Sequence, residues 1–226
     1  MKRGKKYRDS KKKYNPETFY ELSEALAFVK TIAFAKFDET VEVSVKLNLK
    51  KSHSVRDTVV LPHQFRGEKK ILVFCKPEKE KEAQDAGATF VGADDLIDKV
   101  KGGWTDFDVA VATPDMMKDV GKLGMVLGRK GLMPNPKTGT VSFDIKGTLA
   151  ELKKGRVEFR ADKTGVMHLA VGKVSMEPEK VAENVMAVIA EVKRKRPVDL
   201  KGEYIRTVSV ASTMGPGVWV NIKDGQ

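Results

Sequence analysis

Few residues of this chain have types that could do catalytic or metal chemistry. The three histidines, His53, His63 and His168, are far apart in the sequence, and no pair of cysteines stands near them. Structural zinc sites need four Cys or His ligands at short spacing, so no metal site is predicted. The single cysteine, Cys75, lies in an apolar run, where a buried structural thiol is the usual role. No catalytic residue and no cofactor is predicted, and the chain is not expected to be an enzyme.

One segment comes close to a nucleotide-binding motif. Gly131–Thr138, with the sequence GLMPNPKT, nearly matches the phosphate loop G-x-x-x-x-G-K-[ST]. Pro136 replaces the last glycine and has no N–H to donate to a phosphate, and a helix, not a strand, is predicted before the segment. A nucleotide-binding α/β enzyme is therefore the disfavoured alternative. The segment is either a plain rigid loop or one that presents Arg129, Lys130 and Lys137 to a nucleic-acid backbone.

Three other segments have residue types that suit RNA. The first is 36–40 (KFDET), where an exposed Phe37 beside a lysine would be a platform for stacking on nucleotides, and a core-facing Phe at a helix end is the alternative. The second is the turn 162–165 (DKTG), which carries Lys163. The third is the bend 212–215 (STMG), which offers hydroxyls and bare backbone N–H groups. Such groups can read the 2′-hydroxyls and the shape of RNA.

The elements that must position these segments follow from the hydrophobic pattern. Asn15-Pro16 is a good helix start, with Asn15 as the cap and Pro16 in the first turn. A helix is predicted from there, because apolar residues recur at helical spacing. These are Phe19, Leu22, Leu26, Val29 and Ala33. Residues 41–49 then alternate apolar and polar side chains, which predicts a strand with one wet face.

The middle of the chain changes to a different pattern. Residues 71–75 form a continuous apolar run, followed by a charged helical stretch over 78–86. Short strands at 89–91 and 108–112 and a helix at 94–100 continue the alternation, and another helix follows residues 113–115. Strands and helices that alternate at this spacing predict a parallel α/β sheet.

The last part returns to strands with a period of two. Residues 157–161 and 166–171 are predicted to pair as a hairpin around the turn 162–165. A helix is predicted over 177–195, and two strands over 205–211 and 218–222. These parts predict a discontinuous domain of residues 1–66 and 158–226, with residues 67–157 inserted and a hinge near Arg66-Gly67 and Gly155-Arg156. Two consecutive domains are the alternative, but they would leave strand 41–49 without enough partners.

The net charge of +11 is unevenly distributed. Residues 1–13 hold eight Lys or Arg and one Asp, so most of the excess lies in this arm. A basic arm suits nucleic acid, because neutralised phosphates release counterions, and nonspecific binding by the arm alone is a third possible function. A solvated, disordered tail is the structural alternative. No apolar run is long enough for a membrane span, and one cysteine allows no internal disulfide. A cytoplasmic protein without a membrane partner is expected.

The sequence as a whole resembles the bacterial large-subunit ribosomal protein L1 family. The matching motifs are 127–140 (LGRKGLMPNPKTGT), 112–117 (ATPDMM), 163–168 (KTGVMH) with Gly172-Lys173, and 213–216 (TMGP). They occur in the order expected for the family. One departure is Arg129-Lys130, where Pro-Arg is expected; the loop stays basic.

The resemblance implies a hinged stalk protein of α+β and α/β class. It implies a split β-α-β antiparallel-sheet domain with an inserted Rossmann-like three-layer α/β domain. It also implies binding to large-subunit rRNA at the mobile stalk of the ribosome, assistance to the release of tRNA from the exit site, and repression of the protein's own operon mRNA. A monomer is expected when the protein is free. The implied RNA contacts are Lys36, Phe37, Thr40, Ser44, Arg160, Lys163, Gly165, His168, Lys173, Thr213, Met214 and Gly215. Arg129, Lys130 and Lys137 would add secondary contacts to RNA or tRNA.

Overall fold

The chain forms two compact units. The computed structural model describes residues 4–50, 53, 55–65, 67 and 69–222. Met1–Phe65 and Val157–Gln226 make up the discontinuous unit, and Arg66–Arg156 make up the inserted unit. These bounds differ by one residue from those expected from the sequence. Residues 1–3 of the basic arm and Arg66 at the predicted hinge lie outside the described residues, and the hinge stays a prediction.

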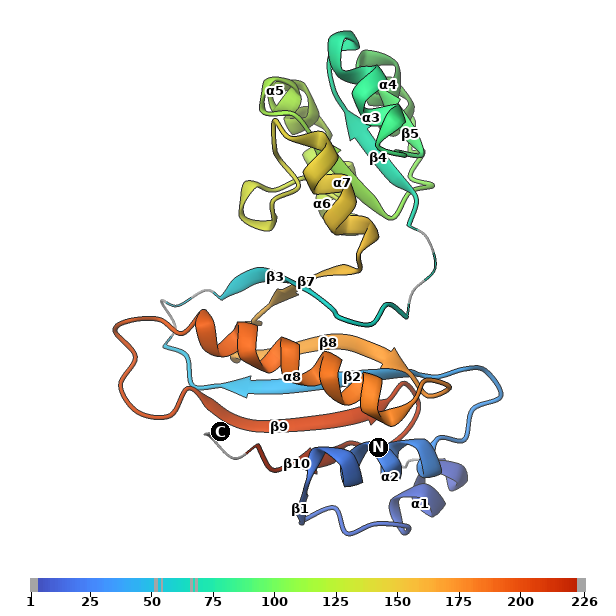
Figure 1. Ribbon diagram of the computed structural model, residues 1–226, viewed down its shortest axis with the longest axis vertical. Helices are drawn as coiled ribbons and strands as arrows, with labels where there is room; N and C mark the ends of the chain where they lie inside the picture. The colour runs from blue at the N-terminus through green and yellow to red at the C-terminus, as the bar shows by residue number, and fades with distance from the viewer. Residues whose placement is uncertain (1–3, 51–52, 54, 66, 68, 223–226) are drawn as a thin grey trace. The chain divides into compact units, whose positions relative to one another are not determined.

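A five-stranded sheet is the frame of the discontinuous unit (Figure 1). Its order is β1-β10-β9-β2-β8, and only the β1–β10 pair is parallel. The strands are β1 (Phe19–Tyr20), β2 (Thr40–Leu47), β8 (Val166–Lys173), β9 (Ile205–Ser212) and β10 (Val218–Val220). The early strand β2 lies between two strands from the end of the chain, so this sheet forms only when both chain ends come together.

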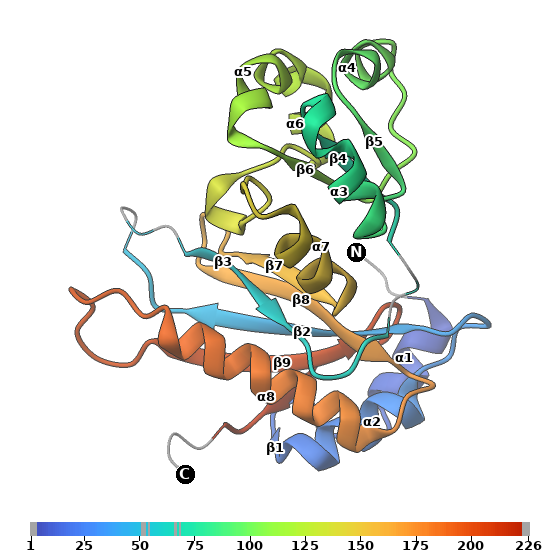
Figure 2. The ribbon, with the colours of Figure 1, turned by 45° about the horizontal axis from the view of Figure 1, so that its top comes forward.

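One face of this sheet carries the core of the unit. Val43 and Val45 of β2 are fully buried, as are Val185 and Val188 of helix α8 (Pro178–Arg194), and all four belong to one hydrophobic cluster. Helix α2 (Leu22–Ile32) adds its own buried stripe to the same cluster. Figure 2 shows α8 running along the sheet. Burying each such side chain contributes about 1.5–3 kcal/mol, so the alternating pattern of β2 fixes which face meets the helices.

The predicted hairpin 157–171 is wrong. Strand β7 (Arg156–Arg160) pairs with β3 (Arg56–Val60) in a separate two-stranded sheet, while β8 pairs with β2. The turn 162–165 does form, with Gly165 N–H donating to the Asp162 carbonyl at 3.0 Å. Long-range pairing with β2 therefore overrides the local hairpin signal, and the sequence reasoning missed β3 as the partner of β7.

The first predicted helix starts later than expected. Asn15 caps only a turn, in which its side chain accepts the N–H of Glu17 at 3.1 Å. Residues Phe19–Tyr20 are strand β1, and Phe19 is exposed instead of buried. The helix itself begins at Leu22. Pairing of β1 with β10 explains the difference, because the extended backbone finds hydrogen-bond partners that the sequence pattern does not reveal.

The basic arm contains a short helix, α1 (Lys5–Lys11). Buried Ser10 donates its hydroxyl to the carbonyl of Ile32 at the end of α2, at 3.0 Å. Tyr14 is also buried and donates to the carbonyl of Gly217 at 2.8 Å. The described part of the arm is therefore packed against the discontinuous unit.

The inserted unit has three layers around a parallel sheet of order β5-β4-β6. The strands are β4 (Ile71–Phe74), β5 (Phe90–Gly92) and β6 (Val109–Ala112). Leu72 and Phe74 belong to a cluster with helices α4 (Asp94–Lys101) and α6 (Gly124–Lys130). Ile71 and Val73 belong to a second cluster with α3 (Glu80–Asp85) and α7 (Ile145–Lys153). Because successive side chains of a strand point to opposite faces, one four-residue strand supplies both interfaces. This confirms the predicted α/β class.

Short helices complete the two outer layers. The first part contains η1 (Pro77–Lys79), α3 (Glu80–Asp85), α4 (Asp94–Lys101), η2 (Pro114–Met116) and α5 (Met117–Val120). The second part contains η3 (Gly121–Leu123), α6 (Gly124–Lys130), η4 (Pro136–Thr138) and α7 (Ile145–Lys153). Across the residues that the structure describes, no helix has the length and apolar character needed to cross a bilayer.

Candidate nucleic-acid interface

The face of the five-stranded sheet opposite to the core is polar. Ser44 of β2 lies at its centre, paired with His168 of β8 on one side and with Ser209 of β9 on the other. The Ser44 hydroxyl and Nδ1 of His168 are 2.9 Å apart. Glu42 and Lys46 flank Ser44 on the same face of β2, because alternate residues share a face. We call this surface the open face.

A buried carboxylate organises one end of the open face. The side chain of Glu39, in a residue only 1% exposed, accepts the N–H groups of Phe34 at 3.0 Å and Ala35 at 2.8 Å on Oε1. Its Oε2 accepts the N–H of Met214 at 3.0 Å. Burial raises the pKa of Glu39, but the N–H groups of Ala35 and Met214 outweigh this and hold the pKa below 4.5. The charged carboxylate thus ties the loop before β2 to the loop after β9.

The two loops that Glu39 joins expose apolar side chains. Phe37 is 56% exposed and Met214 is 51% exposed. A second contact joins the same loops: the Thr213 hydroxyl accepts the N–H of Thr40 at 3.0 Å and donates to its carbonyl at 3.2 Å. The alternative of a core-facing Phe37 is therefore wrong.

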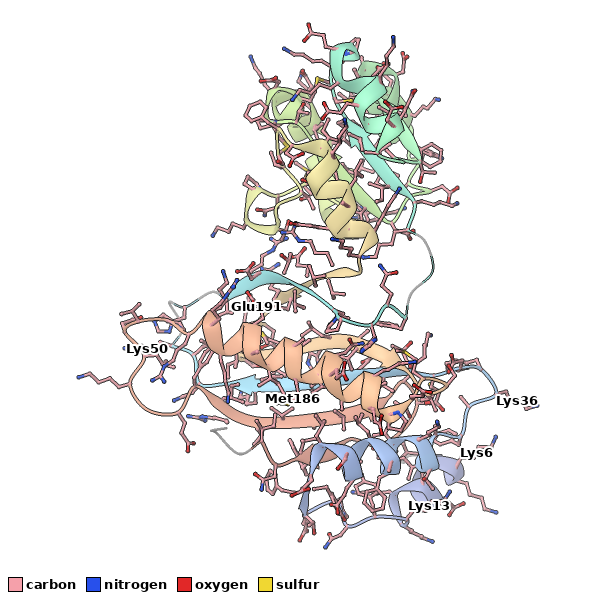
Figure 3. All side chains as sticks on the ribbon, in the orientation of Figure 1. Lys6, Lys13, Lys36, Lys50, Met186 and Glu191 are labelled. Carbon is pink, nitrogen blue, oxygen red and sulfur yellow. The ribbon has the colours of Figure 1, made fainter. Side chains whose placement is uncertain are left out.

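Charged groups surround this end. Lys173 Nζ donates to the hydroxyl of Thr40 at 2.9 Å, so the lysine is fixed beside the Thr213–Thr40 contact. The carboxylate of Asp38 accepts the N–H of Ser175 at 3.1 Å and its hydroxyl at 2.8 Å. Lys36 projects from the loop before β2, and Lys6 and Lys13 lie at the same end of the unit (Figure 3).

The turn 162–165 forms the other end of the open face. The carboxylate of Asp162 accepts the N–H groups of Thr164 and Val166, each at 2.8 Å. The Val166 N–H, followed by the Thr164 hydroxyl, holds the pKa of Asp162 below 3.8. Gly165 has φ +78°, and its carbonyl accepts the N–H of Leu47 at 2.7 Å. Lys46 donates to the carbonyl of Thr164 and ties the turn to β2.

A basic cleft lies beside this turn. It has a volume of about 860 Å³, and its lining includes Lys50, His53, Arg160 and Lys163. Nε2 of His53 is 2.8 Å from the carboxylate of Asp199. Lys50 and Lys36 lie at opposite ends of the sheet (Figure 3). Strand β2 has eight residues, and at about 3.3 Å per residue the face between them is roughly 25 Å long.

The twelve expected contacts all lie on the discontinuous unit, in three groups. Lys36, Phe37, Thr40, Lys173, Thr213, Met214 and Gly215 lie at the Glu39 end, Ser44 and His168 at the centre, and Arg160, Lys163 and Gly165 at the turn. Sequence reasoning missed Glu39, Lys46 and Ser209. The alternation of β2 places Lys46 on the polar side, but nothing in the sequence shows that Glu39 is buried while its neighbour Asp38 is exposed.

Most hydrogen-bond donors of the segment 131–138 are used within the chain. The N–H of Lys137 donates to the Asn135 side chain at 2.9 Å, and the N–H of Gly139 to the Pro136 carbonyl at 3.0 Å. The hydroxyl of Thr138, a residue only 3% exposed, donates to the Asn135 carbonyl at 3.0 Å. In a phosphate loop, backbone N–H groups and the Ser or Thr hydroxyl point at the ligand. In this segment the same kinds of group stabilise a turn of the chain.

The basic residues near this turn are exposed. Arg129 and Lys130 end helix α6, and Lys137 lies in η4. Lys130 donates to the hydroxyl of Thr105. All three residues belong to the inserted unit.

The cysteine and two of the histidines considered for catalysis or metal binding have other contacts in the structure. Burial raises the pKa of the Cys75 thiol to about 11, so it is a poor nucleophile. His63 and His53 each contact a carboxylate on the surface, Glu183 and Asp199. Within the described ranges, no group of three or more His, Cys, Asp or Glu is placed to hold a metal ion.

Comparisons with known proteins agree with the sequence motifs. The model of the "Ribosomal protein L1p/L10e family" matches residues 29–216. "Large ribosomal subunit protein uL1" of Treponema denticola is 66% identical over 226 residues, which is 100% of both chains. The protein of the same name from Treponema pallidum (strain Nichols) is 59% identical over 220 residues, 97% of each chain. That of Borreliella burgdorferi (strain ZS7) is 55% identical over 220 residues, again 97% of each.

Proposed function

The chain belongs to the ribosomal protein L1p/L10e family, and from this premise we propose that its open face binds large-subunit rRNA. The protein is a structural, non-enzymatic component of the large ribosomal subunit. The finer proposal is that the discontinuous unit carries recognition, with contacts from the Glu39 end to the turn 162–165. Its place of work would be the ribosome, in the cytoplasm.

The observation that carries this proposal is the exposed pair Phe37 and Met214 above a fixed polar scaffold. Large apolar side chains that are exposed close together, with polar groups around them, are typical of a binding surface. Buried Glu39 holds both loops, so the pair is positioned before any ligand arrives. RNA offers unpaired bases that stack on such side chains, and 2′-hydroxyls that pair with groups such as Ser44 and Thr213.

Charge at both ends of the open face supports the same ligand. Lys36 and the described part of the basic arm lie at the Glu39 end, and Lys50, Arg160 and Lys163 lie beside the turn. Each lysine or arginine that meets a phosphate releases a condensed counterion. An RNA that lies along the face would therefore meet the polar groups of Ser44 and His168 at the centre and cations at both ends, with the apolar Phe37 and Met214 at the Glu39 end.

Two further roles belong to this proposal because the family resemblance implies them. The first is assistance to the release of tRNA from the exit site, with weaker contacts from Arg129, Lys130 and Lys137. The second is repression of the protein's own operon mRNA, which would occupy the open face in place of rRNA. A shared site predicts competition: leader mRNA should displace the rRNA fragment, and Phe37→Ala should weaken both complexes by the same factor.

The direct test is RNA binding by variants of the two exposed residues. Phe37→Ala and Met214→Ala should each weaken binding of the rRNA stalk fragment by about 1–3 kcal/mol. Met186→Ala is the matched control, because Met186 is 53% exposed on α8, at the helical side of the sheet (Figure 3). Folded Phe37 and Met214 variants that bind like the control would refute the site.

A further inference from the structure

The open face carries an aromatic pair outside the segments considered so far. Phe19 of β1 is 54% exposed and Trp219 of β10 is 38% exposed. The two residues are direct cross-strand partners, and their ring centroids are 6.2 Å apart with the planes tilted by 37°. Trp219 faces away from the core, because its neighbours Val218 and Val220 are buried.

The strand register connects this pair to the proposed RNA contacts. Trp219 pairs with Ser209 of β9, and Ser209 pairs with Ser44 of β2, which in turn pairs with His168. One row across the sheet therefore runs from Phe19 to His168. Neighbouring strands are about 4.8 Å apart, so Trp219 lies roughly 10 Å from Ser44, on the same open face.

Polar groups lie next to the aromatic pair. A pocket beside Phe19 is lined by the polar residues Arg206, Thr207 and Asn221 and by the apolar residues Ile205, Val208, Val220 and Ile222. The guanidinium of Arg206 also donates to the Asn48 side chain at 2.7 Å. Thr207 pairs with Lys46, so the pocket lies one row along the sheet from Trp219. An aromatic surface beside an amide, a hydroxyl and a guanidinium is the combination that stacks on a nucleobase and reads its edge.

We propose that Phe19 and Trp219 form a stacking site for an unpaired nucleotide of the bound RNA, next to the Ser44–His168 centre. This inference rests on the proposed function and adds a contact to it. An exposed aromatic pair at a sheet edge is a liability for aggregation. Continuity with the open face and the surrounding donors assign this edge to RNA instead of to a protein partner.

Tryptophan fluorescence gives a direct readout. The chain has two tryptophans, and Trp104 lies in the inserted unit, 4.9 Å from Phe90 and 5.6 Å from Phe107 between ring centroids. The variant Trp104→Phe leaves Trp219 as the single reporter. Titration of this full-length variant with the rRNA stalk fragment should quench its emission in a saturable way, with the same Kd as a filter-binding measurement. Unchanged emission at saturation would overturn the stacking site, as would quenching that needs other ribosomal proteins.

Affinity measurements supply the second arm. Phe19→Ala and Trp219→Ala should each bind the fragment about tenfold more weakly, because each removes an aromatic ring on which a base stacks. Trp219→Phe should keep most of the affinity, and Met186→Ala all of it. If Trp219→Ala proves unfolded, the fluorescence of Trp104→Phe decides alone.

The two proposals fail differently. If the wild-type protein does not bind the fragment, both the proposed function and the stacking site are refuted. If the wild-type protein instead binds the fragment, with an affinity that Phe37→Ala lowers and that Phe19→Ala and Trp219→Ala leave unchanged, only the stacking site is refuted.

Discussion

Glu39 and Met214 are 175 residues apart in the chain, yet the buried carboxylate of one accepts the N–H of the other at 3.0 Å. This contact joins the loop before β2 to the loop after β9. It is also a link between stability and the candidate interface, because the same carboxylate fixes the loop that carries Phe37.

Glu39→Gln should destabilise the discontinuous unit by about 1–3 kcal/mol at pH 7, because hydrogen bonds to a charged acceptor are replaced by weaker ones. The pKa of Glu39 is lowered from 4.5. Its charged form therefore stabilises the fold above pH 4.5, and that contribution is lost as the pH falls through the folded-state pKa. Urea unfolding at pH 7 and at pH 3 should show the difference between wild type and variant shrinking. A difference that is the same at both pH values would contradict this assignment.

Gly165→Ala should destabilise the protein by about 1–3 kcal/mol. The backbone has φ +78° there, and an added Cβ would lie 2.9 Å from the Leu47 carbonyl oxygen. Gly217→Ala is the matched control, since a Cβ at Gly217 meets nothing within 4 Å. Thermal unfolding of both variants measures the effect. Equal midpoints for the two variants would show that the turn 162–165 adapts without strain.

Neutralising the basic arm should change the salt dependence of binding more than its specificity. Lys5, Lys6 and Lys11 are exposed on α1, and each that contacts a phosphate contributes about 0.7–0.9 to the slope of log K against log salt. The triple variant Lys5→Gln, Lys6→Gln, Lys11→Gln should show a shallower slope of log K against log salt. It should still prefer the stalk fragment to an unrelated RNA of equal length. Loss of that preference would mean that the arm, and not the open face, carries recognition.

Removal of the inserted unit should leave RNA binding in place. A protein with residues 66–156 replaced by a short flexible linker retains the whole five-stranded sheet and its core. We expect it to bind the stalk fragment within about tenfold of the full chain, since every proposed primary contact remains. Circular dichroism should first show that it is folded. A folded deletion variant without affinity would mean that the inserted unit supplies essential contacts.

Nucleotides should not bind to the inserted unit. Most backbone N–H groups of segment 131–138 already donate to groups of the chain itself, as does the Thr138 hydroxyl. Isothermal titration of the full chain with ATP or GTP should give no saturable heat, and Lys137→Ala should behave in the same way. Saturable binding that Lys137→Ala abolishes would revive the nucleotide-binding alternative.

The sequence by itself determined the elements whose side chains repeat regularly. The alternation of β2, the helical stripe of α8 and the apolar run of β4 each identify an element, because burial of one face is the main source of its stability. The motifs from 112 to 216 also determined the family, which the family match at residues 29–216 confirms. The expected RNA contacts, including Lys36, Phe37, Thr40 and Ser44, are those that the resemblance to this family implies, and they stay a prediction.

Only the tertiary structure decided which strands pair and which polar groups are buried. Strand β7 pairs with β3 and not with β8, its neighbour in the sequence. Residues Phe19–Tyr20 form a strand because they pair with β10. Burial of Glu39 beside exposed Asp38 depends on N–H groups brought from two distant loops. The row from Phe19 to His168 likewise joins one residue from each of the five strands. Local residue types cannot specify such pairings, because their energy comes from partners that are distant in the sequence.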